Sequence, residues 1–344
     1  MPAFRRPSSS PLVLLRGLLA DPLALRTTLR MPGRFHKGPL PPLTAAQASL
    51  AGRLRQDVEH VAGNIGERNV FTPDKLAAAE LWLGSRLQKL GHRVNRQAYT
   101  VGAVECANVW IDLPGRSSSD EIVVIGSHYD SVHNCPAAND NGSGVAAVLH
   151  LAAHFASLPD AARPARTLRF VFFANEEPPH FWTENMGSLV FARACRAKAE
   201  KIVAMITPET IGCYLDEPGS QRYPIPLGGW YPTTGDFIAF IGLADSGALV
   251  QQCVGAFRAA AAFPSIGAAL PGIIPGVGSS DHWSFARVGY PALMITDTAP
   301  FRYRYYHTPQ DTPDKMDFER MGRVVEGLEG VVLDLARGPD QDRS

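Results

Sequence analysis

The sequence predicts an α/β fold in three layers, with a central, mostly parallel mixed sheet between two layers of helices. Short apolar segments at 121–126 and 167–174 are typical of strands that are covered on both faces. They alternate along the chain with helical segments, such as the Ala- and Leu-rich segment 142–158. Strands that alternate with helices indicate a layered sheet.

The elements follow one another in a regular order. Thr44 is an N-cap candidate for a helix through Val61, and Thr72-Pro73 begins a second helix that ends at Gly91. The later elements, in chain order, are strands 93–100, 104–113 and 121–126, helix 142–158, strand 167–174, helix 184–198, strands 202–206 and 236–241, helix 246–262, strand 292–296 and helix 318–335. We therefore predict one domain over 43–338, a loosely structured N-terminal extension over 1–42 and a tail over 339–344.

Composition restricts the classes of partner. The chain has 344 residues, with 33 Lys and Arg against 33 Asp and Glu, so its formal net charge of zero gives no reason to expect a nucleic-acid partner. An apolar run of about 18 residues, which a membrane helix needs, is missing. Five cysteines without a CxxC motif favour reduced thiols and a cytoplasmic location, although an apolar segment behind Arg5 and Arg6 leaves secretion open. The oligomeric state stays open.

Polar side chains follow the first buried strand. In an extended chain His128 and Asp130 point the same way, so the carboxylate can orient the imidazole, as in many metal sites. Asp140 lies in a Gly-rich turn before a helix, near the carboxyl ends of the strands, where α/β sheets bind ligands. Taken singly, His128 could be a structural histidine and Asp140 a helix cap.

Three further strands bring similar groups. Strand 167–174 ends in Glu176 and Glu177, of which one carboxylate could bind a metal while the other stays free as a base. Glu209 follows strand 202–206, and His307 lies in a Pro-bracketed loop after strand 292–296. Nitrogen and oxygen donors from four strand ends predict a site for two zinc ions.

These motifs together resemble the co-catalytic zinc exopeptidases, a family that includes leucyl aminopeptidases, glutamate carboxypeptidases and glutaminyl cyclases. The resemblance covers about 60–330 and rests on HYDS at 128–131, AANDNGSG at 137–144, ANEE at 174–177, PETIG at 208–212, SDHWSF at 280–285 and YYHTPQDTPDK at 305–315. It departs at Glu209, where many aminopeptidases of the family carry Asp, and in a Pro-Pro-His-Phe-Trp segment after Glu177.

The resemblance implies a role for each residue. Asp140 would bridge two zinc ions, with His128 and Glu209 completing one and Glu177 and His307 the other. Glu176 would be the general base, Asp130 would orient His128, and Tyr306 would donate a hydrogen bond to the oxyanion. The implied fold is that of the zinc exopeptidases. The implied activity is hydrolysis of a peptide or aminoacyl-amide bond, and an aminopeptidase is the first expectation.

Substrate-binding residues are less specific. Trp182, Tyr223, Trp230 and Tyr305 could line an apolar pocket or merely pack loops, and Asp281 and His282 could support that pocket or form a structural pair. Arg302 and Arg304 could bind a carboxylate, which would favour a carboxypeptidase or dipeptidase. The same residues are also compatible with a single-zinc glutaminyl cyclase, and the same fold with a non-catalytic binding domain. His150 and His154 lie four residues apart on a helix without HExxH, so they are expected not to be ligands.

Overall fold

The computed structural model describes residues 30–224 and 227–338. Its strands are β1 (Asn95–Val101), β2 (Val104–Leu113), β3 (Ser118–His128), β4 (Arg166–Phe173), β5 (Lys201–Pro208), β6 (Ile238–Leu243), β7 (Ser265–Leu270) and β8 (Ala292–Thr296). Its α-helices are α3 (Ala45–Val58), α4 (Pro73–Gln88), α5 (Gly144–Ala156), α6 (Gly187–Ala197), α7 (Gly247–Ala260), α8 (His282–Arg287), α9 (Ala299–Arg302) and α10 (Phe318–Leu335). The predicted tail and most of the predicted extension lie outside the described residues.

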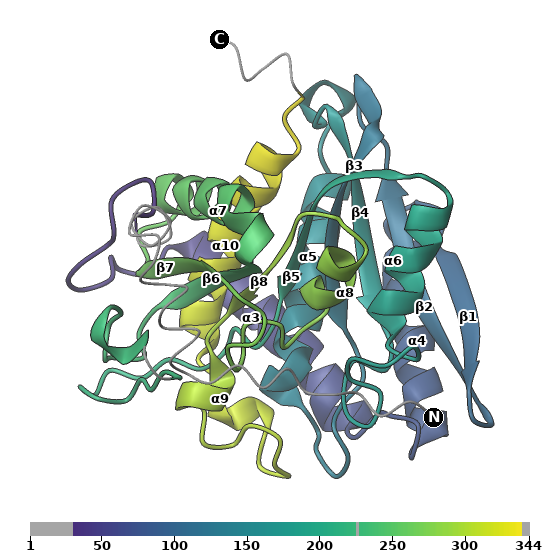
Figure 1. Ribbon diagram of the computed structural model, residues 1–344, viewed down its shortest axis with the longest axis horizontal. Helices are drawn as coiled ribbons and strands as arrows, with labels where there is room; N and C mark the ends of the chain where they lie inside the picture. Colours follow the sequence, from purple (N-terminus) through teal and green to yellow (C-terminus); the bar gives the residue numbers. More distant parts are fainter. Residues whose placement is uncertain (1–29, 225–226, 339–344) are drawn as a thin grey trace.

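These strands form one mixed sheet in the order β1-β2-β4-β3-β5-β8-β6-β7 (Figure 1). The central strands β4, β3, β5 and β8 run parallel to one another. At one edge β2 and β1 continue the sheet in antiparallel fashion, and at the other β6 is antiparallel to β8 and parallel to β7. The predicted fold class, a mostly parallel mixed sheet in an α/β protein, is confirmed.

Helices cover both faces of the sheet. In β3, Val123 and Ile125 belong to the large core that includes side chains of α3, α4, α5, α7 and α10. The intervening residues Ile122 and Val124 belong to a smaller core with side chains of α6 and α8, which lie in front of the sheet in Figure 1. Because β3 is buried on both faces, its sequence is a continuous apolar run rather than an alternating one.

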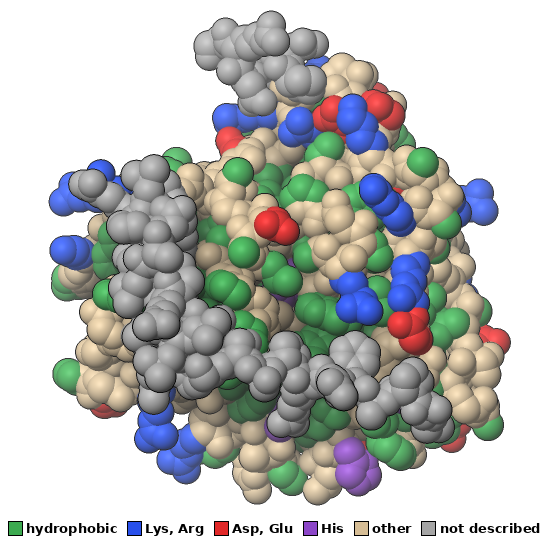
Figure 2. All heavy atoms as spheres, viewed as in Figure 1, with side chains coloured by type: hydrophobic (Ala, Val, Ile, Leu, Met, Phe, Trp, Pro, Cys, Tyr) green, Lys and Arg blue, Asp and Glu red, His purple; other side chains and the backbone are tan. Residues whose placement is uncertain are grey.

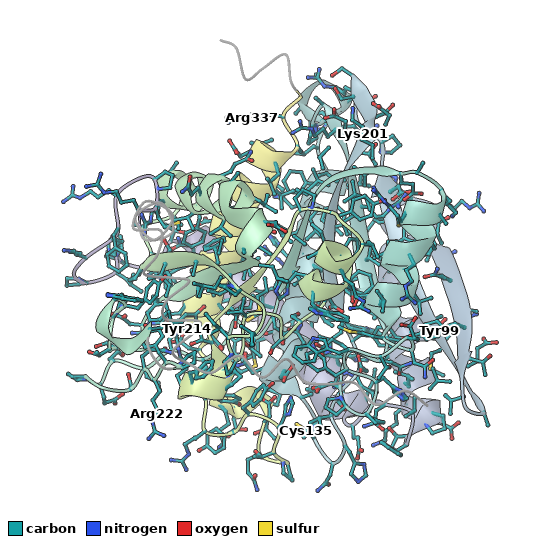
Figure 3. All side chains as sticks on the ribbon, in the orientation of Figure 1. Tyr99, Cys135, Lys201, Tyr214, Arg222 and Arg337 are labelled. Carbon is teal, nitrogen blue, oxygen red and sulfur yellow. The ribbon has the colours of Figure 1, made fainter. Side chains whose placement is uncertain are left out.

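The carboxyl ends of the parallel strands meet at one edge of the sheet. Lys201, which begins β5, lies near the top of Figure 3, whereas Cys135, in the loop after β3, lies near the bottom. Cys135 donates a hydrogen bond from its thiol to the carbonyl oxygen of Thr308 at 3.0 Å. The loops that follow β3 and β8 are thus joined at this edge, where ligands of α/β sheets bind.

The predicted and observed elements agree within three residues at their ends, with three omissions: β7, α8 and α9. The sequence of β7, Ser-Ile-Gly-Ala-Ala-Leu, consists mainly of small residues and lacks the alternation of a half-buried strand. Helices α8 and α9 have six and four residues, which is too short to show a helical period. The sequence does not predict these three elements because none of the segments carries a pattern of its own.

Part of the predicted extension contacts helix α7. Arg258 of α7 donates to the carbonyl oxygens of Met31, Pro32 and Gly33. The domain boundary at residue 43 stays a prediction. Among the helices of the described residues, none has the length and hydropathy that crossing a bilayer requires. All five cysteines are buried free thiols.

On the face shown in Figure 2, hydrophobic side chains gather toward the middle, and Lys and Arg lie mostly toward the periphery.

Candidate metal centre

Seven acidic or histidine side chains converge at the carboxyl edge of the sheet. His128 ends β3, Glu176 and Glu177 follow β4, and Glu209 follows β5. The other three are Asp130, Asp140 and His307, which lie in the loops after β3 and after α9. His128 and the carboxylates are at most 7% exposed, so this is a buried cluster of charge.

Five of these side chains form two groups that share Asp140. In the first group, His128 Nε2 lies 3.4 Å from one carboxylate oxygen of Asp140 and 3.2 Å from Glu209 Oε2. In the second, His307 Nε2 lies 2.9 Å from the other oxygen of Asp140 and 3.2 Å from Glu177 Oε2. Each group has one imidazole nitrogen and two carboxylate oxygens, so each could hold a metal ion, with Asp140 common to both.

The donor atoms fit metal ligands better than hydrogen-bonding groups. Both ring nitrogens of His128, Nε2 of His307 and Oε1 of Glu177 are buried and form no hydrogen bond. Buried polar atoms without a partner cost free energy, and a cation on these atoms removes that cost. The nitrogen and oxygen donors suit zinc.

The pKa values of these groups in the absence of a cation also indicate that the cluster binds a metal. Burial raises the pKa of Glu177 to about 7, that of Glu209 to about 8, and that of Glu176 well above its ordinary value. Burial acts to lower the pKa of His307, but the nearby carboxylates of Asp140 and Glu177 raise it to about 10. Carboxylates and histidines this close must hold protons or a metal, and a divalent cation can take the place of those protons.

Three neighbouring groups position the cluster. Asp130 lies 3.4 Å from Nδ1 of His128 and accepts hydrogen bonds from the backbone N–H groups of Glu176 and Glu177, at 3.0 and 3.1 Å. Asp311 accepts from the backbone N–H of Asp140 at 3.1 Å, and the Ser280 hydroxyl donates to Glu209 at 2.7 Å. The sequence predicts that Asp130 faces His128, whereas Asp311 and Ser280 lie in the YYHTPQDTPDK and SDHWSF motifs, where the sequence alone assigns them no role.

Arg68 also supports the centre, and the sequence does not predict this role. Its side chain is 0% exposed and forms hydrogen bonds to carbonyl oxygens of two segments, the loop between β3 and Asp140 and the residues just before Arg68. Its guanidinium donates to the carbonyl oxygens of Tyr129, Pro136, Ala137, Val61 and Gly66. A single arginine far away in sequence carries no local signal for such a role.

Left-handed backbone conformations flank the site. Asn175, just before Glu176, has φ 59°, Thr210, just after Glu209, has φ 51°, and His307 itself has φ 57°. Residues with side chains rarely adopt positive φ, and where they do the surrounding structure must hold them in place. The chain thus turns sharply at the points where three of the polar side chains enter the centre.

Tyr306 lies over the second group. Its ring stacks on the His307 imidazole with ring centroids 3.8 Å apart. Burial, together with the charges of Asp140, Glu177, Glu209 and Glu176, raises the pKa of Tyr306 far above its ordinary value. The hydroxyl therefore keeps its proton and can donate a hydrogen bond near the carboxylates.

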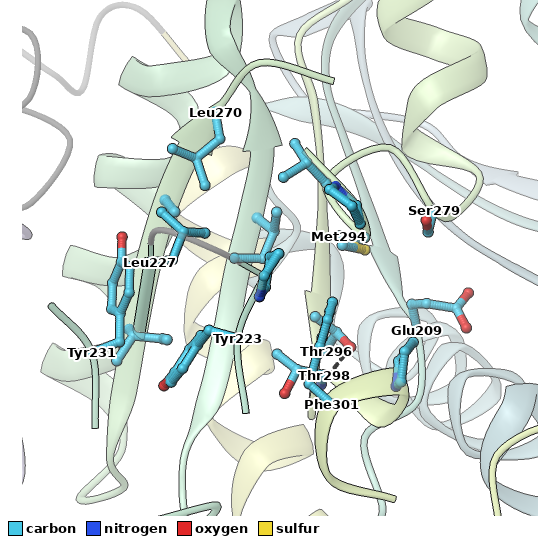
Figure 4. Close-up of a pocket in the computed structure, with 18 of the residues that line it drawn as sticks. Glu209, Tyr223, Leu227, Tyr231, Leu270, Ser279, Met294, Thr296, Thr298 and Phe301 are labelled. Carbon is cyan, nitrogen blue, oxygen red and sulfur yellow. Dashed lines mark hydrogen bonds between the residues drawn. The ribbon is translucent and has the colours of Figure 1, made fainter. Parts of the chain in front are cut away.

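An apolar pocket of about 730 Å³, part of it open to solvent, adjoins the centre (Figure 4). Glu209 and Tyr306 belong to both the pocket and the centre. Glu209 and Ser279 lie at one end in Figure 4, and Leu227 and Tyr231 lie toward the other. The floor comes from strands β6, β7 and β8, through Ile241, Ile266, Ala268, Leu270 and Met294.

The predicted substrate-binding residues differ in where they lie. Tyr223 lines the pocket, as expected of a rim loop rich in aromatics. Trp182 is 49% exposed and its indole N–H donates to the carbonyl oxygen of Gly278, on a segment that forms the pocket wall. Trp230 is 41% exposed and Tyr305 packs against Tyr303, and neither lines the pocket.

Asp281 and His282 are both buried, and neither lines the pocket. Nε2 of His282 lies 2.8 Å from the carbonyl oxygen of Val277, and burial lowers the pKa of His282 to about 4. A neutral imidazole can donate that bond. Asp281 is 0% exposed with neither oxygen hydrogen-bonded, and burial raises its pKa to about 6. His282 thus supports the pocket wall through Val277, whereas Asp281 lies near His128 of the centre.

Known proteins share this sequence pattern and fold. Residues 108–332 match Peptidase family M28. An uncharacterised protein of Escherichia coli K12, YfbL, is 33% identical over 285 residues, which cover 80% of this chain and 85% of YfbL.

Two solved structures are similar in fold. A zinc aminopeptidase from Bacillus subtilis covers 83% of this chain, is itself covered to 95%, and has a TM-score of 0.65 at 15% identity. A glutaminyl cyclase from Fimbriiglobus ruber covers 87%, is itself covered to 98%, and has a TM-score of 0.58 at 20% identity.

Proposed function

Since the chain belongs to Peptidase family M28, we propose that it is an aminopeptidase that binds two zinc ions and removes apolar residues from the free N-termini of peptides. Family membership makes it a metallopeptidase. The observation that carries the finer proposal is that Glu209 and Tyr306 join the two-group centre to an apolar pocket.

The ligand roles follow from the two groups. His128, Asp140 and Glu209 would hold one zinc ion, and Asp140, Glu177 and His307 the other. Bound zinc would polarise the scissile carbonyl and lower the pKa of a water molecule toward about 7. Glu176 is in neither group, so its carboxylate stays free for proton transfer.

Glu176 is the general base of this proposal. Its Oε2 lies 3.9 Å from Nε2 of His128, and Asp130 fixes its backbone N–H. It would accept a proton from the attacking water and pass that proton to the departing amine. A raised pKa suits both halves of this cycle, because a carboxyl group that titrates nearer neutral pH can take up and release a proton.

Tyr306 would stabilise the charge that develops on the substrate oxygen. Its hydroxyl stays protonated in the field of the surrounding carboxylates, and its ring is fixed by stacking on His307. A donor held in place before the reaction costs no reorganisation when the oxyanion forms.

The pocket supports an apolar first residue. A side chain between Leu227, Ile241 and Met294 would leave the adjoining carbonyl beside Glu209 and Tyr306. Among the described residues, no Lys or Arg lines this pocket. Arg302, one of the two candidates for binding a substrate carboxylate, is 8% exposed and donates to the backbone carbonyls of Gly235 and Phe237. The other candidate, Arg304, does not line the pocket, and both observations weigh against a carboxypeptidase.

Glutaminyl cyclase activity is the second candidate, favoured by the similarity in fold to the Fimbriiglobus ruber enzyme. Both candidates need a free N-terminus and similar residues, so product analysis separates them. A cyclase releases ammonia from an N-terminal Gln peptide, whereas an aminopeptidase releases the first amino acid.

A panel of peptides with Leu, Phe, Ala, Glu or Gln first, each with a free or acetylated N-terminus, tests the proposal. We expect release of free Leu or Phe from the unblocked peptides and none from the acetylated ones. Ammonia from the Gln peptide without hydrolysis of the Leu peptide would instead establish the cyclase.

A further inference from the structure

A second cluster of potential metal ligands lies between helices α5 and α10, which both pack into the large core. His150 and His154 are four residues apart on α5, and Glu329 faces them from α10. Nε2 of His150 lies 2.7 Å from Glu329 Oε1, and Nδ1 of His154 lies 3.5 Å from the same oxygen. The three side chains are 13%, 35% and 23% exposed, so a dissolved ion can reach them.

The spacing of the donor atoms suits a tetrahedral zinc ion. Zinc bonds of about 2.0–2.1 Å at tetrahedral angles separate neighbouring ligand atoms by roughly 3.3 Å. The observed separations of 2.7 and 3.5 Å lie on either side of this value, and all three donor atoms lie within 4.8 Å of one another. Small side-chain rotations would therefore bring the donors to bonding positions.

The arrangement of charges favours a cation over a simple ion pair. Two imidazoles point at one carboxylate oxygen, and only a protonated or donating nitrogen can bond it. Within the described chain Glu329 forms ion pairs with these two histidines and no Lys or Arg. A divalent cation would bind both imidazole nitrogens and the carboxylate at once.

We propose that His150, His154 and Glu329 form a further divalent-cation site of the zinc class, which links α5 to α10. The site is separate from the centre at the strand ends, because His150 lies about 9 Å along α5 from Gly144, at 1.5 Å per residue. It departs from the expectation, based on sequence, that these histidines are not ligands. Its occupation would stabilise the folded chain by mass action, since an unfolded chain does not hold the three groups together.

Zinc binding to the holoenzyme tests this site without depending on the peptidase proposal. Protein that retains its catalytic metal is dialysed against added ZnCl₂, and bound zinc is counted for the wild type, His154→Gln and Glu329→Gln. His133→Gln is the matched control, because His133 also pairs with a glutamate, Glu67, at 3.1 Å but has no second histidine.

We expect the wild type and His133→Gln to bind one more zinc per chain than His154→Gln and Glu329→Gln, and added zinc to raise Tm only in the first two. Far-ultraviolet circular dichroism spectra should be alike in all four, which shows that each variant is folded. Equal zinc binding by all four proteins, or no difference in the zinc-dependent Tm shift, would overturn the proposal.

Discussion

The metal centre and the apolar pocket share Glu209 and Tyr306 but differ in how they are built. Buried charged groups form the centre, and residues behind them, such as Asp130 and Asp311, fix their backbone. Aliphatic side chains of three strands form the pocket, together with loop residues such as Tyr223. The centre therefore depends on geometry set by hydrogen bonds, and the pocket depends on shape.

This difference predicts different kinetic effects. Groups that act on the transition state change kcat, whereas groups that bind substrate and transition state equally change KM. Substitutions in the centre should therefore lower kcat for every substrate. Substitutions in the pocket should change KM for some first residues and leave others as they were.

The largest effect is expected for Glu176→Gln. Loss of the base should lower kcat on the order of 10²–10⁴-fold while zinc stays bound. Glu177→Gln is the matched control, because Glu177 belongs to a ligand group and its loss should reduce bound zinc. If Glu176→Gln loses zinc, or keeps nearly normal kcat, the roles of the two adjacent glutamates are assigned wrongly.

Tyr306→Phe should have the next largest effect. Removing one oxyanion donor costs about 2.7–4 kcal/mol of transition-state stabilisation. The decrease should fall on kcat, with KM, zinc content and Tm little changed, because only one oxygen is lost. A rise in KM alone would mean that Tyr306 binds the substrate, as the pocket residues do, and does not stabilise the oxyanion.

Asp311→Asn should lower the affinity of the centre for zinc, because Asp311 holds the backbone of Asp140 in place. The carboxylate accepts bonds from the backbone of Asn139 and Asp140 and from the Tyr303 hydroxyl, and an amide cannot accept all of them. Loss of such an outer partner typically costs 10–100-fold in metal affinity or activity. We expect weaker zinc retention against a chelator, and Tyr303→Phe, which removes one bond, should show a smaller change. Equal retention by Asp311→Asn and wild type would contradict this role.

The smallest effect is expected in the pocket. Ala268→Leu adds three carbon atoms to its floor on β7. For a Leu-first peptide kcat/KM should fall on the order of 10-fold, mainly through KM, since small changes in an apolar pocket have effects of this size. An Ala-first peptide serves as the control and should be cleaved as before. Equal losses for both peptides would mean that the pocket does not hold the first side chain.

The two regions also differ in how far the sequence predicts them. The residues of the centre stand at the ends of apolar strands, so His128, Asp140, Glu176, Glu177, Glu209 and His307 could be placed together from the order of the strands. The pocket depends on β7, whose small residues lack a strand pattern, and on Ile241 and Met294, which resemble core residues in the sequence. Trp230 has the aromatic character expected of a pocket residue but lies outside the lining.

The residues that support the centre are the hardest to predict from the sequence. Arg68 lies about 70 residues before Pro136 and Ala137, whose carbonyl oxygens it bonds. Such a contact depends on how the loops pack, and nothing near Arg68 in the chain indicates it.

Zinc content against activity, measured during reconstitution of the metal-free enzyme, tests the central proposal most directly. The His150→Gln/His154→Gln double variant should be used, so that the helical cluster does not add to the count. We predict two zinc ions per chain at saturation, with peptidase activity that is complete only when the second has bound. Full peptidase activity with at most one zinc per chain would contradict the two-zinc account.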